Sequence, residues 1–177
     1  MSGPRVISQG SWLVVYALMQ GCAQAGSETR PALLEARWTG ADSGVMRGPA
    51  TARWCADNRF AELLGLQGDT GIAIAIRRVD SLVPGQYPAV LPDSADSISA
   101  SATVALRFLA RSSVSGYQSD SGSVTLDRDA GGRLSARFQV RARVLGAAGR
   151  ISLRGSAVAM NVVRGGEECT TPWRPSQ

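Results

Sequence analysis

Residues 134–144 read Leu-Ser-Ala-Arg-Phe-Gln-Val-Arg-Ala-Arg-Val, in which apolar and polar side chains alternate without a break. A period of two is typical of a β-strand with one buried face and one face in water. The segment Gly-Ala-Ala-Gly at 146–149 turns the chain, and residues 150–163 read as a second strand. These segments predict the clearest hairpin in the sequence, with a wet face rich in arginine.

Similar patterns continue on the N-terminal side of this hairpin. Isoleucine occupies every second position of residues 72–76, and residues 60–66 precede it across a Gln-Gly-Asp-Thr turn, which predicts another hairpin. Further strands are expected around Trp38 and over residues 50–54, 104–108 and 117–127. Residues 82–100, with three prolines, read as a long surface loop. About eight short strands and no helix after residue 20 predict an all-β fold, an antiparallel β-sandwich or small barrel.

Composition excludes several kinds of chemistry. The chain has 177 residues, enough for one domain, and a formal net charge of +5. All 19 cationic side chains are arginine, because the sequence contains neither lysine nor histidine. Without histidine there is no Ser-His-Asp triad, no Cys-His pair and no imidazole metal ligand, and without lysine there is no Schiff base. We therefore expect a protein that is not an enzyme and holds neither a cofactor nor a metal.

The N-terminal residues have the order of an export signal. Residues 1–5 carry one arginine, and residues 12–19 form the apolar run Trp-Leu-Val-Val-Tyr-Ala-Leu-Met. This run is shorter than the roughly 20 apolar residues that cross a bilayer core as a helix. The sequence therefore predicts a signal peptide or membrane anchor.

The segment Met19-Gln20-Gly21-Cys22 resembles the lipobox of bacterial lipoprotein precursors. Gly21 and Cys22 match that motif, whereas leucine is usual where Met19 stands and a small residue where Gln20 stands. The resemblance covers four residues and implies that Cys22 is lipidated and becomes the first residue of the mature protein. A cleaved signal without lipid, or a retained anchor, is the alternative. We expect the protein in the cell envelope, on the periplasmic side of a bacterial membrane, with inner and outer membrane both open.

The expected organisation has four parts. A signal or anchor at 1–22 is followed by a flexible tether at 23–32, a β-sandwich domain at 33–169 and a polar tail at 170–177. If Cys22 carries a lipid, Cys55 and Cys169 remain, and in an exported protein two such cysteines predict a disulfide. Two free, buried thiols are the alternative.

Arginine is concentrated on the predicted hairpin, which makes one strand face strongly cationic. The candidate residues for binding a partner or lipid headgroups are Arg133, Arg137, Arg141, Arg143, Arg150 and Arg154. A cationic sheet face can meet anionic headgroups or an acidic protein surface. No nucleic acid is expected, because the protein is predicted to be exported and no aromatic platform accompanies the arginines. A solvated face that serves solubility is the alternative.

Acidic residues suggest two further kinds of site. Asp127, Asp129 and the following glycines have acids spaced by two before glycine, as a calcium loop does, but they lack its other oxygen ligands. A hairpin turn explains the same residues more simply. Asp93, Asp96 and Asp120 could form a carboxylate pair of the glycosidase kind, although nothing in their spacing requires it.

Three functional hypotheses follow. The first is a non-catalytic, membrane-anchored accessory subunit of a membrane protein complex, whether respiratory, photosynthetic or assembly-related, with the membrane and other subunits as partners. The second is a small-ligand-binding lipoprotein with a calycin-like barrel. The third, a hydrolase that uses loop carboxylates, has the least support.

Overall fold

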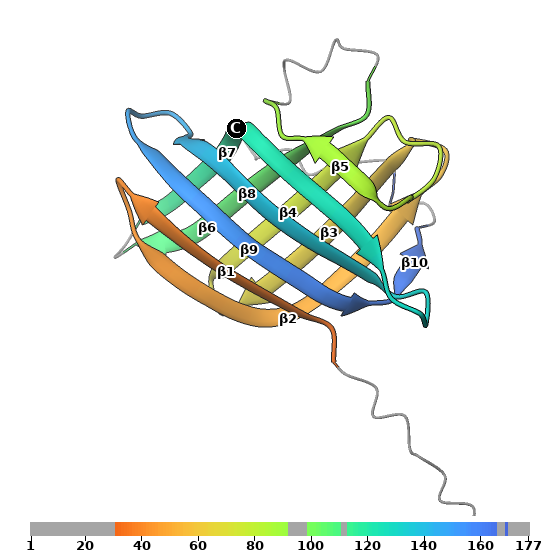
Figure 1. Cartoon of the computed structure of the whole chain (residues 1–177). Helices are drawn as coiled ribbons and strands as arrows, with labels where there is room; N and C mark the ends of the chain where they lie inside the picture. The colour runs from red at the N-terminus through yellow and green to blue at the C-terminus, as the bar shows by residue number, and fades with distance from the viewer. Residues whose placement is uncertain (1–30, 92–98, 111–112, 166–168, 170–177) are drawn as a thin grey trace, which may run out of the picture.

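The computed structural model describes residues 31–91, 99–110, 113–165 and 169 (Figure 1). The predicted signal, almost all of the tether, the tail, Cys22, Asp93 and Asp96 lie outside these residues. The described residues form ten strands and no α-helix, which confirms the all-β prediction. The strands are β1 (Leu33–Gly40), β2 (Gly44–Cys55), β3 (Phe60–Gln67), β4 (Thr70–Arg77), β5 (Gly85–Pro88), β6 (Ser101–Ala110), β7 (Ser113–Arg128), β8 (Leu134–Val144), β9 (Arg150–Met160) and β10 (Val162–Arg164).

Eight of these strands form a closed up-and-down barrel. Strands β1, β2, β3, β4, β6, β7, β8 and β9 each pair antiparallel with the next, and β9 pairs back onto β1. The sequence left open a sandwich or a barrel, and the structure is a barrel. Closure leaves these eight strands without the long exposed edge of an open sheet, which would invite pairing with other chains.

The two short strands, β5 and β10, form where a strand of the barrel extends past the end of its neighbour. β7 is longer than β6, and β5 pairs with residues 123–126 of β7, which lie past the point where β6 begins. The segment predicted as a plain loop therefore contains a strand. Likewise β1 begins at Leu33, opposite Val158, so the chain beyond Met160 finds no partner in β1. β10 instead pairs parallel with residues 52–54 of β2, which splits the second strand of the predicted hairpin into two.

Side chains fill the inside of the barrel. Twelve large apolar side chains that face inward have less than 2% of their surface accessible to solvent or to an internal void, so no water-sized space adjoins them. They are Leu34, Leu63, Ile72, Ile74, Ile76, Val104, Leu106, Val124, Leu126, Leu134, Leu153 and Met160. The alternation read from the sequence is therefore the alternation of lumen and solvent around the barrel.

Aromatic rings span the lumen near the turns that follow β1 and β6. Trp38 on β1 and Phe108 on β6 come from opposite sides of the barrel, with three strands between them in each direction, and their ring centroids lie 5.5 Å apart. Tyr117 on β7 stacks on Phe108 at 6.2 Å and donates its hydroxyl proton to Asp42 in the β1–β2 turn. Stacked rings of this kind add attraction beyond their buried area. This end of the lumen is closed by the stack.

The tyrosine in this stack makes stability depend on pH in alkali. Burial, and then the hydrogen bond and charge of Asp42, raise the pKa of Tyr117 from 10.0 to about 12. A raised phenol pKa means that folding favours the neutral form, so this contribution is complete below pH 10 and is lost as the pH rises towards 12. We expect the difference in tyrosinate absorbance between the protein and Tyr117→Phe to titrate with a midpoint about 12. A midpoint near 10 would contradict the buried pair.

A disulfide joins Cys55 at the end of β2 to Cys169, which confirms the predicted pairing. The two Cα atoms lie 5.6 Å apart and 114 residues separate the partners in sequence. Asn58 also donates a side-chain hydrogen bond to the Cys169 carbonyl oxygen at 2.5 Å. The bridge therefore ties the chain beyond β10 to the end of the barrel where β1 begins.

Candidate anion-binding face

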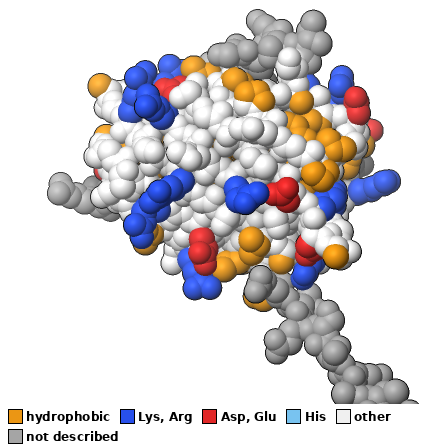
Figure 2. Space-filling view, viewed as in Figure 1, with side chains coloured by type: hydrophobic (Ala, Val, Ile, Leu, Met, Phe, Trp, Pro, Cys, Tyr) orange, Lys and Arg blue, Asp and Glu red, His pale blue; other side chains and the backbone are white. Residues whose placement is uncertain are grey.

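The outward-facing surface of β8, β9 and β1 carries most of the predicted arginines. Inward residues of β8 are apolar, so Arg137, Arg141 and Arg143 alternate with them and point to solvent. Arg150 and Arg154 on β9 are exposed in the same way. Figure 2 shows blue side chains spread over this front surface, separated by white ones. We call the set Arg37, Arg137, Arg141, Arg143, Arg150 and Arg154 the arginine face.

Strand register brings arginines directly opposite one another. Arg143 on β8 faces Arg150 on β9, and Arg154 on β9 faces Arg37 on β1. Like charges in directly opposed positions of a sheet destabilise the pairing. Two such pairs on one face are therefore a cost to stability that a bound anion would relieve.

Arg37 was missed by the sequence analysis. Its strand, β1, becomes a neighbour of the hairpin only through the β9–β1 pairing that closes the barrel. Arg37 itself is exposed and sits beside Glu35, whose carboxylate is 2.9 Å from the Nε atom of Arg47. The local alternation around Trp38 places Arg37 on a solvent-exposed face, but it does not indicate that Arg37 lies next to Arg154.

Acidic partners neutralise only part of this face. Arg137 binds Asp127 at 2.9 Å, and the Nε atom of Arg150 is 3.5 Å from Asp120. Within the ranges that the structure describes, Arg37, Arg141, Arg143 and Arg154 have no ion pair. These four side chains are therefore the ones that can meet an external anion without breaking an existing contact.

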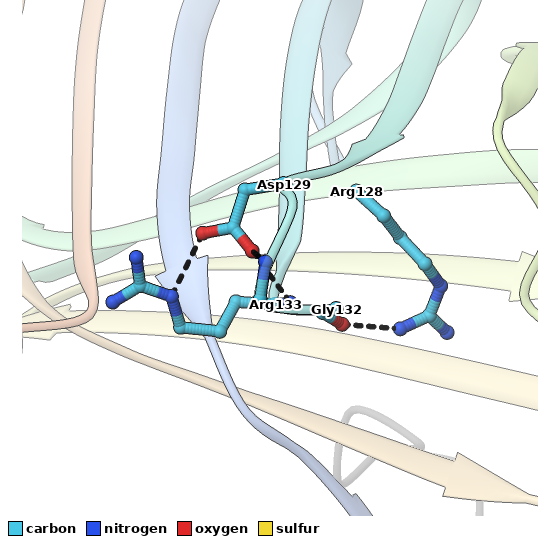
Figure 3. Close-up of polar contacts among 5 residues, drawn as sticks. Arg128, Asp129, Gly132 and Arg133 are labelled. Atoms are coloured by element: carbon cyan, nitrogen blue, oxygen red, sulfur yellow. Dashed lines mark hydrogen bonds and ion pairs between the residues drawn. The ribbon is translucent and has the colours of Figure 1, made fainter.

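The sixth predicted residue, Arg133, lies elsewhere and is already engaged. It belongs to the β7–β8 turn, where Asp129 accepts hydrogen bonds from the backbone of Gly131 and Arg133 and from the Arg133 Nε atom at 2.8–2.9 Å (Figure 3). The backbone N–H of Arg133 is the main cause that holds the pKa of Asp129 below its ordinary value. Arg128 donates to the Gly132 carbonyl from the other side of the turn.

This bonding also bears on the calcium alternative. Both carboxylate oxygens of Asp129 serve the turn, and Asp127 serves Arg137. Among the described residues, no group of three His, Cys, Asp or Glu side chains could hold a metal ion. Asp127 and Asp129 therefore stabilise the β7–β8 hairpin and its turn.

Hydroxyl and amide groups surround the free arginines. Ser121, Ser123, Gln139 and Ser152 line a shallow depression of about 500 Å³ beside Arg141, over β7, β8 and β9. The depression lies at a bulge of β7, where the register shifts between Ser119 and Ser121. Gly122 is needed next to this bulge because a Cβ there would lie 2.2 Å from the Gln139 carbonyl oxygen.

The chemistry of this surface is that of anion recognition. Arginine presents planar N–H donors to phosphate or carboxylate, and serine and glutamine add neutral donors and acceptors around them. Asp120, one of the carboxylates considered for catalysis, lies against Arg150, and the structure does not describe Asp93 or Asp96. The described residues thus assemble a cationic surface out of β8, β9 and β1.

The part of the chain that the structure describes contains no helix long and apolar enough to span a membrane. No protein-family model matches the chain, and neither the curated proteins nor the solved structures contain a match.

Proposed function

We propose that this protein is a non-catalytic, membrane-anchored accessory subunit of a membrane protein complex on the periplasmic side of a bacterial envelope. The N-terminal segment, with Cys22 as lipidation site, would hold it at the membrane. The arginine face would bind an anionic surface, either of another subunit or of the membrane around the assembly. The N-terminal segment supports the membrane anchoring, and β1, β8 and β9 carry the arginine face.

The observation that carries the proposal is the two pairs of directly opposed arginines on this face. Arg143 with Arg150 and Arg37 with Arg154 lie in direct register, and only Arg150 among them contacts a carboxylate in the described part of the chain. Each opposed pair destabilises the sheet relative to neutral partners. Solubility alone requires scattered charges rather than opposed ones, so the arrangement favours a surface that an anionic partner covers.

The filled lumen favours this role over the calycin-like alternative. A barrel that carries a small ligand needs an interior cavity, usually of at least about 300 Å³. Here twelve large inward-facing apolar side chains adjoin no water-sized void, and the Trp38–Phe108 stack bridges opposite walls. Binding on the outer surface is the better-supported use of this barrel.

The proposal predicts that the protein from native membranes migrates as part of a larger assembly after solubilisation in mild detergent. Replacing Arg141, Arg143 and Arg154 together by glutamine should shift most of it to the free chain. A net charge of +5 − 3 = +2 results, so a control of equal charge is Arg47→Gln, Arg59→Gln and Arg164→Gln. Arg47 and Arg59 form exposed ion pairs worth little in stability.

Native electrophoresis distinguishes the outcomes. The control triple variant should migrate with the wild type, and the arginine-face triple variant should not. Migration of the wild type only as a free monomer would overturn the proposal. Equal migration of the two triple variants would assign the effect to net charge and remove the role of the arginine face.

A further inference from the structure

We infer that the arginine face lies against anionic lipid headgroups, with the tip of the β8–β9 hairpin dipping into the membrane interface. This inference rests on the proposed membrane anchoring and names the occupant of the arginine face. In this orientation the barrel axis lies along the membrane surface. The contact surface then runs from β1 to the tip of the β8–β9 hairpin.

The hairpin tip is apolar and lies between two arginines. Leu145 is 41% exposed, and Ala147 and Ala148 are also exposed, while Arg143 and Arg150 form the last opposed pair before the turn. The Leu145 side chain rests over Gly116 of β7, where a Cβ would be 3.4 Å from its Cδ1 atom. An aliphatic tip with arginines directly behind it is the pattern of segments that lie in the headgroup region.

The neighbouring β6–β7 hairpin continues this apolar tip. Leu109 and Val114 are register partners and are 49% and 64% exposed. Arg107 lies two residues before Leu109 on β6 and is the register partner of Gly116. The Leu145 side chain covers this glycine. Leu109 and Val114 therefore add exposed aliphatic surface beside the tip of the β8–β9 hairpin.

Charge and composition select lipid as the occupant. A second copy of this chain would bring Arg143, Arg150 and Arg107 against the same arginines, which disfavours self-association. Protein interfaces gain most from tryptophan, tyrosine and arginine anchors, but the exposed large hydrophobic residues described at these two tips are Leu109, Val114 and Leu145. A fluid headgroup layer accepts separate aliphatic tips, and its anionic lipids attract the arginines behind them.

The position of the N-terminal segment fits this orientation. The chain enters the barrel at Leu33 on β1, which borders β9. Figure 1 shows this start of β1 at the opposite end from the β8–β9 turn. Ten residues, 23–32, can span at most about 33–36 Å. A barrel anchored through them can therefore lie with the arginine face on the membrane and the hairpin tip at the far end.

Magnitudes predict a measurable effect. One arginine near an anionic membrane surface favours the bound state about fivefold, so three give about 100-fold. Partial burial of one leucine side chain adds about tenfold. The substitutions that remove these groups lie on exposed positions, so they should leave the fold intact.

The experiment is hydrogen exchange of the full chain reconstituted into two kinds of vesicle. One is pure phosphatidylcholine, and in the other a quarter of the lipid is phosphatidylglycerol. We expect the amides of residues 145–149 to exchange about tenfold more slowly in the anionic vesicles. Leu145→Ser should reduce the slowing, and the triple variant Arg141→Gln, Arg143→Gln, Arg154→Gln should abolish it. Val163→Ser, 64% exposed on β10 at the other end of the barrel, should retain it.

Each outcome decides between occupants. Equal exchange of the tip in both kinds of vesicle would overturn the lipid inference. If the tip is then protected only in native membranes that contain the assembly, the occupant is a protein and the proposed function stands. If the tip is protected in anionic vesicles while the native protein migrates as a monomer, the lipid contact stands and the subunit proposal fails.

Discussion

Replacing Cys55 and Cys169 by alanine is expected to lower the free energy of unfolding by about 4–5 kcal/mol. The reason is chain entropy, because the bond closes a loop of 114 residues and so removes many conformations from the unfolded state. A domain of this size is commonly stable by about 5–15 kcal/mol, so the variant should lose about a third of its stability or more. Chemical denaturation of the detergent-solubilised protein, followed by fluorescence, measures the difference.

Cys22→Ala serves as the control for this prediction. It removes the proposed lipidation site but no part of the bridge, so we expect the denaturation midpoint to remain at the wild-type value. A loss below 1 kcal/mol in the double variant would contradict the account, since it would mean that the bond closes no significant loop in the unfolded chain. Reduction of the wild-type protein should reproduce the double variant.

Trp38→Ala is expected to cost about 3–5 kcal/mol of stability. Trp38 is 5% exposed and stacks on Phe108 from the opposite wall of the barrel, so its removal leaves a cavity that neighbouring strands cannot close. The Cβ position of Gly44 would lie 2.3 Å from the indole ring, which shows how closely the backbone is fitted to it. Denaturant unfolding of the variant tests the value.

Leu66→Ala is the matched control for this truncation. Leu66 is half exposed on the outer surface of β3, so its loss should change stability by no more than about 0.5 kcal/mol. If Trp38→Ala also cost this little, the end of the lumen would not be packed. The Trp38–Phe108 contact would then give no evidence against a ligand inside the barrel.

Local pattern predicted the strands because the barrel interior repeats the same alternation on every strand. Leu134, Phe138 and Ala142 are buried and Arg137, Arg141 and Arg143 are exposed, as their period of two requires. The closure of β9 onto β1 was not predictable in this way, since it joins residues such as Arg154 and Arg37 that share no local signal. Only that closure distinguishes the barrel from a sandwich.

The short strands and the turn show the same limit. β5 and β10 form because β7 and β2 extend past their neighbours, which is a property of lengths in three dimensions. Arg133 carries the same charge as the residues of the arginine face, yet Asp129 four residues earlier binds it in the turn. The face therefore gains Arg37 and loses Arg133 relative to the sequence prediction.

Native mass spectrometry of the wild-type protein, solubilised from its own membranes in mild detergent, tests the proposed role most directly. The account predicts an assembly heavier than one chain. The subunit it releases should begin at a lipid-modified Cys22 and contain the Cys55–Cys169 bond. A free, unmodified monomer that retains no membrane association would contradict the account.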